Sequence, residues 1–326
     1  MVNKRQDWLD TVAKVEALQV AKDRRCFSAT HEEILSGATT DIYFVKTLEI
    51  LRHLHKEDSV VVAELFPRRD GILAGTEELL RFLADKDVEV WVMEEGSPIH
   101  DKEVVVRIKG KYSEFGLFET TMLGILASSS GWATAAKIMK EACGEKQMCC
   151  FGSRHLHPAV APVMERAAMI GGADSCSCIL GAKLLGLEPA GTCPHALFLI
   201  VGNTVEGAKA YDAVMPPEAT RLMLVDTFKD EIEESLLLGE ALGEKLQGVR
   251  LDTPSERGGV TVGLIKELRA RLDMAGYPQV KIFVSGGLTP EKARLLAAAG
   301  ADSFGVGSYI SVSYTHLIAG SRLFSN

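Results

Sequence analysis

The chain has 326 residues, of which 47% are hydrophobic and 25% are charged, and its formal net charge is −8 at pH 7. The length allows one large core or two modest ones, and the acidic balance argues against a nucleic-acid-binding surface, which needs a clustered basic face. No apolar run approaches the ~20 residues that span a bilayer, and the charged N-terminus lacks the apolar core of a signal peptide, so we expect a cytoplasmic protein.

The first 141 residues predict a helical extension followed by a mixed sheet domain. Residues 1–27 have the pattern of an amphipathic helix, and Thr30 to Glu33 forms a capping box, in which two side chains satisfy the free amides of a helix start. A helix opens at 39–44 and runs through 47–54. Strands are expected at 59–65, 88–93 and 104–109, with a helix at 75–83 between the first two and a long helix at 117–141. Because these strands do not strictly alternate with helices, an α+β sheet domain is favoured.

From Met148 onward the pattern changes to strand then helix, repeated. Strands are expected at 149–153, 175–180, 222–225, 248–251, 282–284 and 303–306, and helices at 158–170, 205–214, 230–246, 260–272 and 290–298. Such alternation means parallel strand pairing, and this many units predict an α/β barrel or a doubly wound sheet. The pattern stops after Ile310, so we expect residues 311–326 to be an atypical tail, either sequence that is not native to the protein or an irregular terminus.

Two glycine turns stand at the carboxyl ends of the last two predicted strands. They are Ser285-Gly286-Gly287 and Gly305-Val306-Gly307-Ser308. Residues without side chains let backbone amides approach an oxyanion there, as they do after the last strands of a (β/α) barrel. Either turn alone is explained by chain reversal. The two in tandem predict a phosphate site at Ser285, Gly286, Gly287, Gly305, Gly307 and Ser308.

Polar side chains occur where the other predicted strands meet their loops. They are Arg154, His155 and His157, then Thr192 and His195, then Asp226 and Thr227, and finally Asp252 and Thr253. Taken singly, a loop histidine is usually a surface residue, an Asp often caps a helix, and Arg154 could simply pair with one of the two aspartates. Together they suit a phosphorylated, partly cationic reaction centre, because phosphate prefers amides and arginine whereas a developing sugar cation prefers carboxylates.

The seven cysteines contain no C-x-x-C pair, so a zinc knuckle or a redox dithiol is poorly supported. Cys176 and Cys178 would share one face of a strand. A metal site there is the less favoured alternative to buried, inert thiols.

Six segments, in this order along the chain, resemble the motifs of nicotinate phosphoribosyltransferases, which belong to the type II phosphoribosyltransferase family. They are Thr39–Tyr43, Gly116–Thr120, Phe151–Pro158, Gly191–Ala196, Val284–Gly287 and Gly305–Ser308. The resemblance extends from about Phe27 to Ile310. It implies an α/β protein with an N-terminal α/β sandwich domain at 28–141, after an extension at 1–27, and an irregular α/β barrel at 142–310.

The resemblance also implies an activity. Members transfer the phosphoribosyl group of phosphoribosyl pyrophosphate to the ring nitrogen of nicotinate, giving nicotinate mononucleotide and pyrophosphate, the salvage entry to NAD. Mg²⁺ would arrive with the pyrophosphate donor, whose oxygens supply most of its ligands. ATP would be a co-substrate, and the protein would be a homodimer or a higher homo-oligomer without a nucleic-acid or membrane partner.

Residue roles are implied by the matched motifs. His195 matches the histidine that ATP phosphorylates, and a neutral imidazole is a suitable phosphoryl acceptor. Asp226 and Asp252 would bind the ribose or stabilise its cationic character. Tyr43 would stack on the pyridine ring across a dimer interface, and Arg154 would contact the nicotinate carboxylate or a phosphate. The further substrate contacts would be His155, His157, Thr192 and Thr227, and the four glycines of the two turns would bind the 5′-phosphate.

Two departures from the family pattern leave alternatives open. Many members have a second arginine where this chain has His155, and members continue beyond the second glycine turn, where some carry a zinc-binding cysteine cluster. Quinolinate is an alternative acceptor that would need more cationic residues, and nicotinamide is one that has no charge for Arg154 to pair. A truncated, non-catalytic nucleotide-binding member is favoured by the tail and disfavoured by the intact motifs.

Overall fold

The computed structural model describes residues 5–312 and 318–325, and its helices and strands fall into two compact units. The first contains the chain up to Thr134 together with the last strand, and the second begins at Ala135. One unit is built on an antiparallel sheet and the other on a parallel sheet, so the predicted α/β fold class is confirmed. None of the described helices has both the length and the apolar character needed to cross a membrane.

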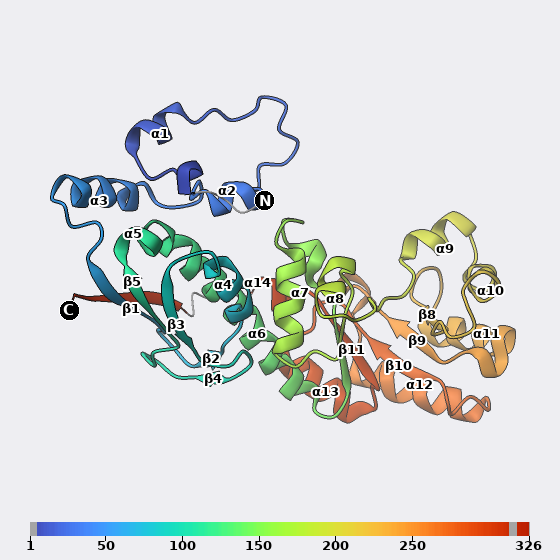
Figure 1. Ribbon diagram of the computed structural model, residues 1–326. Helices are drawn as coiled ribbons and strands as arrows, with labels where there is room; N and C mark the ends of the chain where they lie inside the picture. The colour runs from blue at the N-terminus through green and yellow to red at the C-terminus, as the bar shows by residue number, and fades with distance from the viewer. Residues whose placement is uncertain (1–4, 313–317, 326) are drawn as a thin grey trace. The chain divides into compact units, whose positions relative to one another are not determined.

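The first unit is a four-stranded antiparallel sheet with helices packed against it (Figure 1). The strand order is β12-β1-β5-β3, with β1 at Val60–Pro67, β3 at Val88–Val92, β5 at Val106–Lys111 and β12 at Ile318–Ser325. A two-stranded ribbon joins β2 (Gly71–Ile72) to β4 (Pro98–Ile99). The helices are α2 (His31–Leu35), α3 (Ile42–His53), α4 (Thr76–Leu83), α5 (Tyr112–Phe115), η2 (Gly116–Phe118) and the first part of α6 (Glu119–Cys143).

The core of this unit explains its strand positions. Leu65 of β1, Ile108 of β5 and Leu79 of α4 are fully buried, and Phe118 packs edge-on against Trp8 with ring centroids 4.8 Å apart. Alternate residues of β5 face this core, which gives the two-residue period that predicted the strand. The capping box at Thr30 is confirmed, since its hydroxyl accepts from the Glu33 amide while the Glu33 carboxylate accepts from the Thr30 amide.

The N-terminal extension is less helical than predicted. Helix is limited to η1 (Arg5–Asp7) and α1 (Val12–Ala17), and residues 18–27 are irregular. Most of that stretch is exposed, with Phe27 95% exposed, so no apolar face is available to hold a longer helix. Of the atypical tail, residues 318–325 pair with β1, whereas residues 313–317 lie outside the described part of the chain.

The second unit is a six-stranded parallel sheet in the order β7-β6-β11-β10-β9-β8. The strands are β6 (Gln147–Cys150), β7 (Ser175–Cys176), β8 (Leu222–Leu224), β9 (Gly248–Leu251), β10 (Lys281–Val284) and β11 (Ser303–Val306). Neighbours in the sheet are neighbours in sequence, and β11 returns to pair with β6, which is barrel order with an opening between β7 and β8. All carboxyl ends therefore lie at one rim.

Helices surround this sheet on the outside (Figure 1). They are α7 (Ala161–Ile170), α8 (Ile179–Leu184), α9 (His195–Val201), α10 (Thr204–Val214), α11 (Glu231–Leu242), α12 (Val262–Met274), α13 (Pro290–Ala299) and α14 (Ser308–Val312), with short 3-10 turns η3 (Gly152–His155), η4 (Gly243–Lys245) and η5 (Ser255–Arg257). The strand predicted at 175–180 is wrong beyond Cys176, because Cys178 is already the N-cap of α8.

Candidate active site

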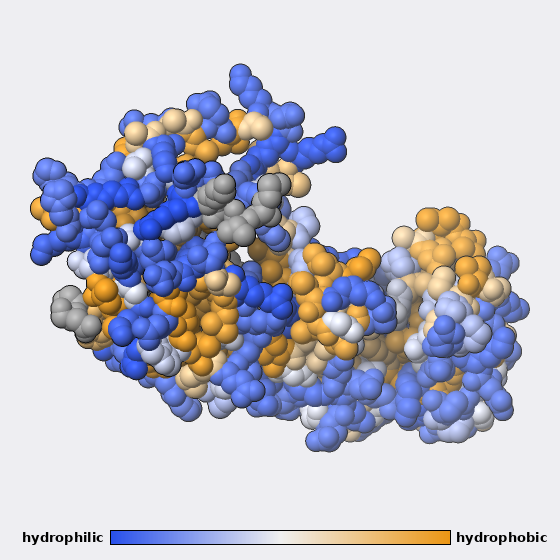
Figure 2. Space-filling model, viewed as in Figure 1, coloured by the Kyte–Doolittle hydropathy of each residue, from blue (hydrophilic) through white to orange (hydrophobic). Residues whose placement is uncertain are grey.

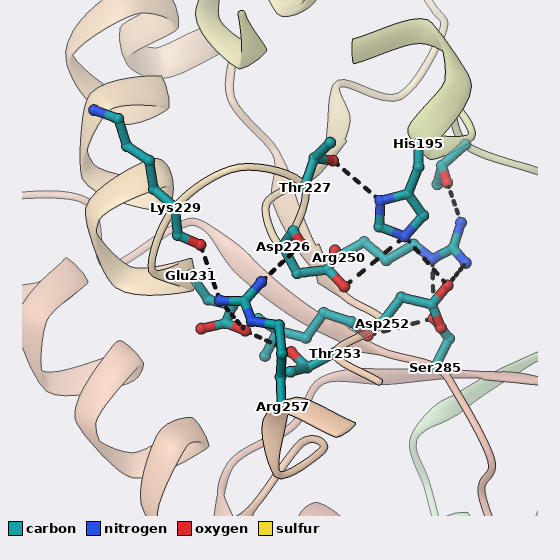
Figure 3. Close-up of polar contacts among 12 residues, drawn as sticks. His195, Asp226, Thr227, Lys229, Glu231, Arg250, Asp252, Thr253, Arg257 and Ser285 are labelled. Carbon is teal, nitrogen blue, oxygen red and sulfur yellow. Dashed lines mark hydrogen bonds and ion pairs between the residues drawn. The ribbon is translucent and has the colours of Figure 1, made fainter. Parts of the chain in front are cut away.

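His195 lies between two carboxylates at the carboxyl ends of β8 and β9 (Figure 3). It is the first residue of α9, not a loop residue as predicted, and its Nε2 atom is 3.9 Å from Oδ2 of Asp226 and 3.9 Å from Oδ2 of Asp252. Its Nδ1 atom is 3.1 Å from Oγ1 of Thr227, where the tautomer decides which group donates. The structure thus brings together the three residues predicted to be catalytic, from three separate segments.

The carboxylate of Asp226 is buried without a hydrogen-bond partner among the described residues, although His195 lies 3.9 Å from its Oδ2 atom. The residue is 4% exposed, and neither carboxylate oxygen accepts a hydrogen bond from the residues that the structure describes. Burial raises the pKa of Asp226, the neighbouring His195 opposes the rise, and Asp252 adds to it. A buried charge without donors is costly, so this arrangement is one that gains from a cationic or hydrogen-bond-donating ligand.

Asp252 is held by a network centred on Arg250, a residue that the sequence interpretation missed. Arg250 donates from Nη2 to Oδ2 of Asp252 at 2.9 Å, from Nε to Oγ of Ser285 at 2.9 Å and from Nη1 to Oγ1 of Thr192 at 2.9 Å. Ser285 in turn donates to Oδ1 of Asp252 at 3.0 Å. The signal for Arg250 was its position two residues before Asp252, on the same face of a strand whose other residues are apolar.

Two stacked rings lie beneath this network. Phe151 and Phe283 have ring centroids 5.8 Å apart and planes 24° apart, and the Cζ atom of Arg250 is 5.4 Å from the Phe151 centroid. Phe151 belongs to the motif that also contains Arg154, but only its polar residues were singled out from the sequence. We call the two rings, with the guanidinium over one of them, the shelf; they combine apolar surface with a positive charge.

The loop after β6 contains three residues that were predicted to contact substrate, and they have different surroundings in the structure. Arg154 and His155 are exposed, and the two aspartates pair with His195 and Arg250, so the alternative in which Arg154 pairs with an aspartate is wrong. His155 reaches the second glycine turn, because a Cβ atom at Gly307 would be 3.0 Å from its Nε2 atom. His157 is exposed and its Nδ1 atom accepts from the Ala159 amide at 3.1 Å, a local turn contact.

The two glycine turns are only partly as predicted. Gly286 and Gly287 follow β10 with φ values of +87° and +55°, a left-handed conformation that favours glycine and turns successive amides outward. Gly307 and Ser308 form the passage from β11 into α14. Gly305, however, lies inside β11, where a Cβ atom would be 2.4 Å from a ring carbon of Phe151. Its place is explained by ring packing, and the prediction that it lies in a turn is wrong.

Tyr43 belongs to the first unit, on α3, and its side chain is largely exposed, with 56% of the residue accessible.

Cysteine chemistry is not supported at the rim of the second unit. Burial raises the pKa of Cys149 to about 12 and that of Cys176 to about 11, which keeps both as inert thiols. Within residues 5–312 and 318–325 no group of three or more His, Cys, Asp or Glu side chains is arranged to hold a metal ion.

Sequence models of a known family match most of the chain. The N-terminal domain of quinolinate phosphoribosyl transferase matches residues 41–130, and the C-terminal domain matches residues 132–316. With the barrel-ordered sheet and its rim of carboxylates, these matches define a phosphoribosyltransferase-like fold. The chain belongs to the type II phosphoribosyltransferase family, as the resemblance of its motifs predicted.

Curated relatives are named nicotinate phosphoribosyltransferases. One from Mycobacterium tuberculosis is 31% identical over 252 residues, which are 74% of this chain and 53% of the relative. One from Bacillus subtilis is 28% identical over 227 residues, 68% of this chain and 45% of the relative. The chain spans about half the length of the curated relatives it matches.

Solved structures share the fold. The crystal structure of a nicotinate-nucleotide pyrophosphorylase from Pyrococcus furiosus is 43% identical, has a TM-score of 0.86, and is matched over 92% of this chain and 77% of its own. Human nicotinic acid phosphoribosyltransferase has a TM-score of 0.71 at 20% identity, over 87% of this chain and 74% of its own, which is a likeness of fold alone.

Proposed function

We propose that the protein is a nicotinate phosphoribosyltransferase, which joins nicotinate to phosphoribosyl pyrophosphate and releases pyrophosphate for NAD synthesis. The observation that carries the proposal is the placement of His195 3.9 Å from both Asp226 and Asp252, on the rim that also carries the Gly286-Gly287 turn. The names of the curated relatives point to the same reaction.

The charges of the rim suit this chemistry. Breaking the bond between ribose and pyrophosphate leaves positive charge on the sugar, and two fixed carboxylates stabilise that charge without reorganisation. The amides of the Gly286-Gly287 turn and the start of α14 at Ser308 would receive the 5′-phosphate. The shelf of Phe151 and Arg250 is suited to a flat acceptor ring.

Nicotinate is favoured as the acceptor because it carries one carboxylate. Arg250 is already paired with Asp252 at 2.9 Å, so Arg154 is the arginine of the β6 loop that is left for an acceptor charge. Quinolinate, with two carboxylates, is the second candidate, and the observation in its favour is that the matching family models describe quinolinate phosphoribosyl transferase. Nicotinamide has no charge for Arg154 and is the least favoured.

Mg²⁺ and ATP are proposed as reaction partners. The unpartnered oxygens of Asp226 fit a hard cation, and with Asp252 they would give it two carboxylate ligands, the remainder coming from pyrophosphate and water. When bound, the ion would neutralise charge on the leaving pyrophosphate. Nε2 of His195, which faces both carboxylates, would accept a phosphoryl group from ATP and so couple hydrolysis to transfer.

We also propose that the active form is a homodimer or a higher homo-oligomer in the cytoplasm. The support is exposed apolar surface on α8 and α9, where Figure 2 shows apolar side chains gathered over α9. The exposed residues are Ile179 (71%), Leu180 (56%), Leu184 (55%), Leu199 (61%) and Ile200 (85%). Apolar patches of this kind mark association surfaces, and Tyr43 is exposed enough to enter a partner's site.

The test is pyrophosphate release from phosphoribosyl pyrophosphate with Mg²⁺, offering nicotinate, quinolinate and nicotinamide separately, each with and without ATP. Release with nicotinate that ATP increases is the expected result. Release with quinolinate, accompanied by CO₂, would move the assignment to the second candidate. No release with any acceptor would contradict the enzymatic proposal and favour a nucleotide-binding role.

A further inference from the structure

The loops after β8 and β9 are fastened to each other by Arg257 (Figure 3). Arg257 lies in η5, in the loop after β9, and donates from Nη1 to the carbonyl of Asp226 at 3.1 Å and from Nη2 to the carbonyl of Lys229 at 3.2 Å. Both carbonyls belong to the loop after β8. One side chain therefore fixes two points of the loop that carries Asp226.

Glu231 makes a second connection between the same loops. It is the first residue of α11, is 6% exposed, and its Oε1 atom accepts from the hydroxyl of Thr253 at 2.7 Å. The same oxygen lies 3.8 Å from Nη2 of Arg257. The loop from Asp226 to the start of α11 is thus held at both ends by residues that follow β9.

This connection between the loops matters because the Asp226 side chain has no hydrogen-bonded anchor among the described residues and meets His195 at 3.9 Å. Neither of its carboxylate oxygens accepts a hydrogen bond from the described residues, whereas Asp252 is held by Arg250 and Ser285. A carboxylate without hydrogen-bond donors depends chiefly on its backbone for its position, because the His195 ring, 3.9 Å away, is beyond hydrogen-bond distance. The backbone carbonyl of Asp226 is the group that Arg257 holds.

We propose that Arg257 and Glu231 are positioning residues, which keep the Asp226 carboxylate facing His195 by clamping the loop after β8 to the loop after β9. This inference rests on the proposed phosphoribosyl transfer for its consequence in catalysis. Both terminal nitrogens of Arg257 donate to backbone carbonyls of the loop after β8, so we assign it a role that is exerted through the position of Asp226.

Arg269 offers a matched control at the opposite end of the barrel. It lies on α12 and donates from Nη1 to the carbonyl of Val280 at 2.7 Å and from Nη2 to the carbonyl of Tyr277 at 3.0 Å, with Asp273 as its acidic neighbour at 2.7 Å. Its contacts are of the same kind as those of Arg257, but they hold the loop before β10, far along the strand from the rim.

The experiment compares Arg257→Ala, Arg257→Lys and Arg269→Ala with the wild-type protein in the pyrophosphate-release assay. A shift of about 1 Å at a reacting group can cost 100-fold in rate, so we expect Arg257→Ala to lower kcat by on the order of 10- to 100-fold with little change in KM. Arg257→Lys should recover part of the loss. Arg269→Ala should keep the wild-type kcat, while its melting temperature should fall by about as much as that of Arg257→Ala.

Hydrogen exchange at the amides of residues 226–231 supplies a readout that does not depend on activity. We expect faster exchange there in Arg257→Ala and in Glu231→Ala, and unchanged exchange in Arg269→Ala. If the wild-type protein releases no pyrophosphate, the proposed function fails while this measurement still decides the clamp. Wild-type exchange in Arg257→Ala, or a kcat equal to that of Arg269→Ala in an active enzyme, would overturn the inference.

Discussion

The guanidinium group of Arg250 lies over the ring of Phe151, with its Cζ atom 5.4 Å from the ring centroid. This contact fixes the plane of the guanidinium, which in turn places three donors toward Thr192, Ser285 and Asp252 at 2.9 Å each. A charged group inside a barrel needs such complete pairing, because desolvation without partners would cost several kcal/mol. Arg250 therefore connects the Phe151 ring to the carboxylate of Asp252.

Replacing Arg250 by lysine should show whether the site needs only a positive charge at this position or also the planar set of donors of a guanidinium. Lysine keeps the positive charge but cannot present three donors in one plane. Hydrogen bonds to charged groups are worth about 1.5–3 kcal/mol each, so we expect kcat/KM for pyrophosphate release to fall at least 10- to 100-fold. Arg107→Lys is the control, since Arg107 pairs with Glu64 on the sheet of the first unit. An Arg250→Lys enzyme as active as this control would contradict the assigned role.

A methyl group at Gly305 should disturb the shelf. Its Cβ atom would lie 2.4 Å from a ring carbon of Phe151 and 2.8 Å from one of Phe283, and overpacking of this kind costs about 1–3 kcal/mol. Gly305→Ala should therefore lower the free energy of unfolding in urea by that amount and weaken acceptor binding. Gly124→Ala is the control, because nothing lies within 4 Å of that position and an exposed helix site should gain up to about 1 kcal/mol.

The repeating half of the fold was predictable from sequence for a physical reason. Strand β10 contains a short apolar run, Ile282–Val284, bounded by polar residues, and all three residues are buried. In β9 the buried residues Val249 and Leu251 flank Arg250. Helix α9 was missed because Leu199 and Ile200 are exposed together, which leaves no amphipathic period to detect. The pairing of β12 with β1 depends on distant backbone groups and gives no local signal.

The site residues that could be predicted from sequence are polar residues that follow predicted strands or lie in a family motif. Residues whose role depends on packing against distant parts of the chain could not be predicted. Asp226 and Asp252 were singled out because they follow predicted strands, and His195 because its segment resembles the family motif; the structure places the three together. Arg250 was missed because it lies within a strand, and Gly305 was assigned to a turn although a ring contact explains it. The contribution of Arg257 depends on which loops meet at the rim, and that is a property of the folded chain.

Asp226→Asn should make the protein more stable and inactive. The pKa of Asp226 is raised by burial, so the folded state retains this proton to a higher pH than the unfolded state does. Stability contributed by the protonated carboxyl is then lost as pH rises from the ordinary aspartate pKa through the raised one. At neutral pH an amide avoids this cost, and we expect a gain on the order of 1 kcal/mol.

The measurement for Asp226→Asn is the melting temperature between pH 4 and pH 8, for the variant and the wild-type protein. The stability difference should grow as pH rises across the titration and then level off. Pyrophosphate release should fall at least 100-fold, the size of effect seen when a preorganised charge is removed from a transition state. A variant that is less stable than wild type at pH 8 would show that His195 or Arg250 outweighs the burial of Asp226.

His195→Ala should remove the response to ATP and leave a slower, ATP-independent transfer, because the imidazole is the proposed phosphoryl acceptor while Asp226 and Asp252 stay in place to stabilise the sugar cation. The direct measurement is acid-labile phosphate on the protein after incubation with γ-labelled ATP, which should be present in wild type and absent in the variant. His100→Ala is the control, since His100 is an exposed histidine of the first unit that faces Asp70. Label retained in His195→Ala, or ATP stimulation of equal size in both variants, would assign the coupling to another residue.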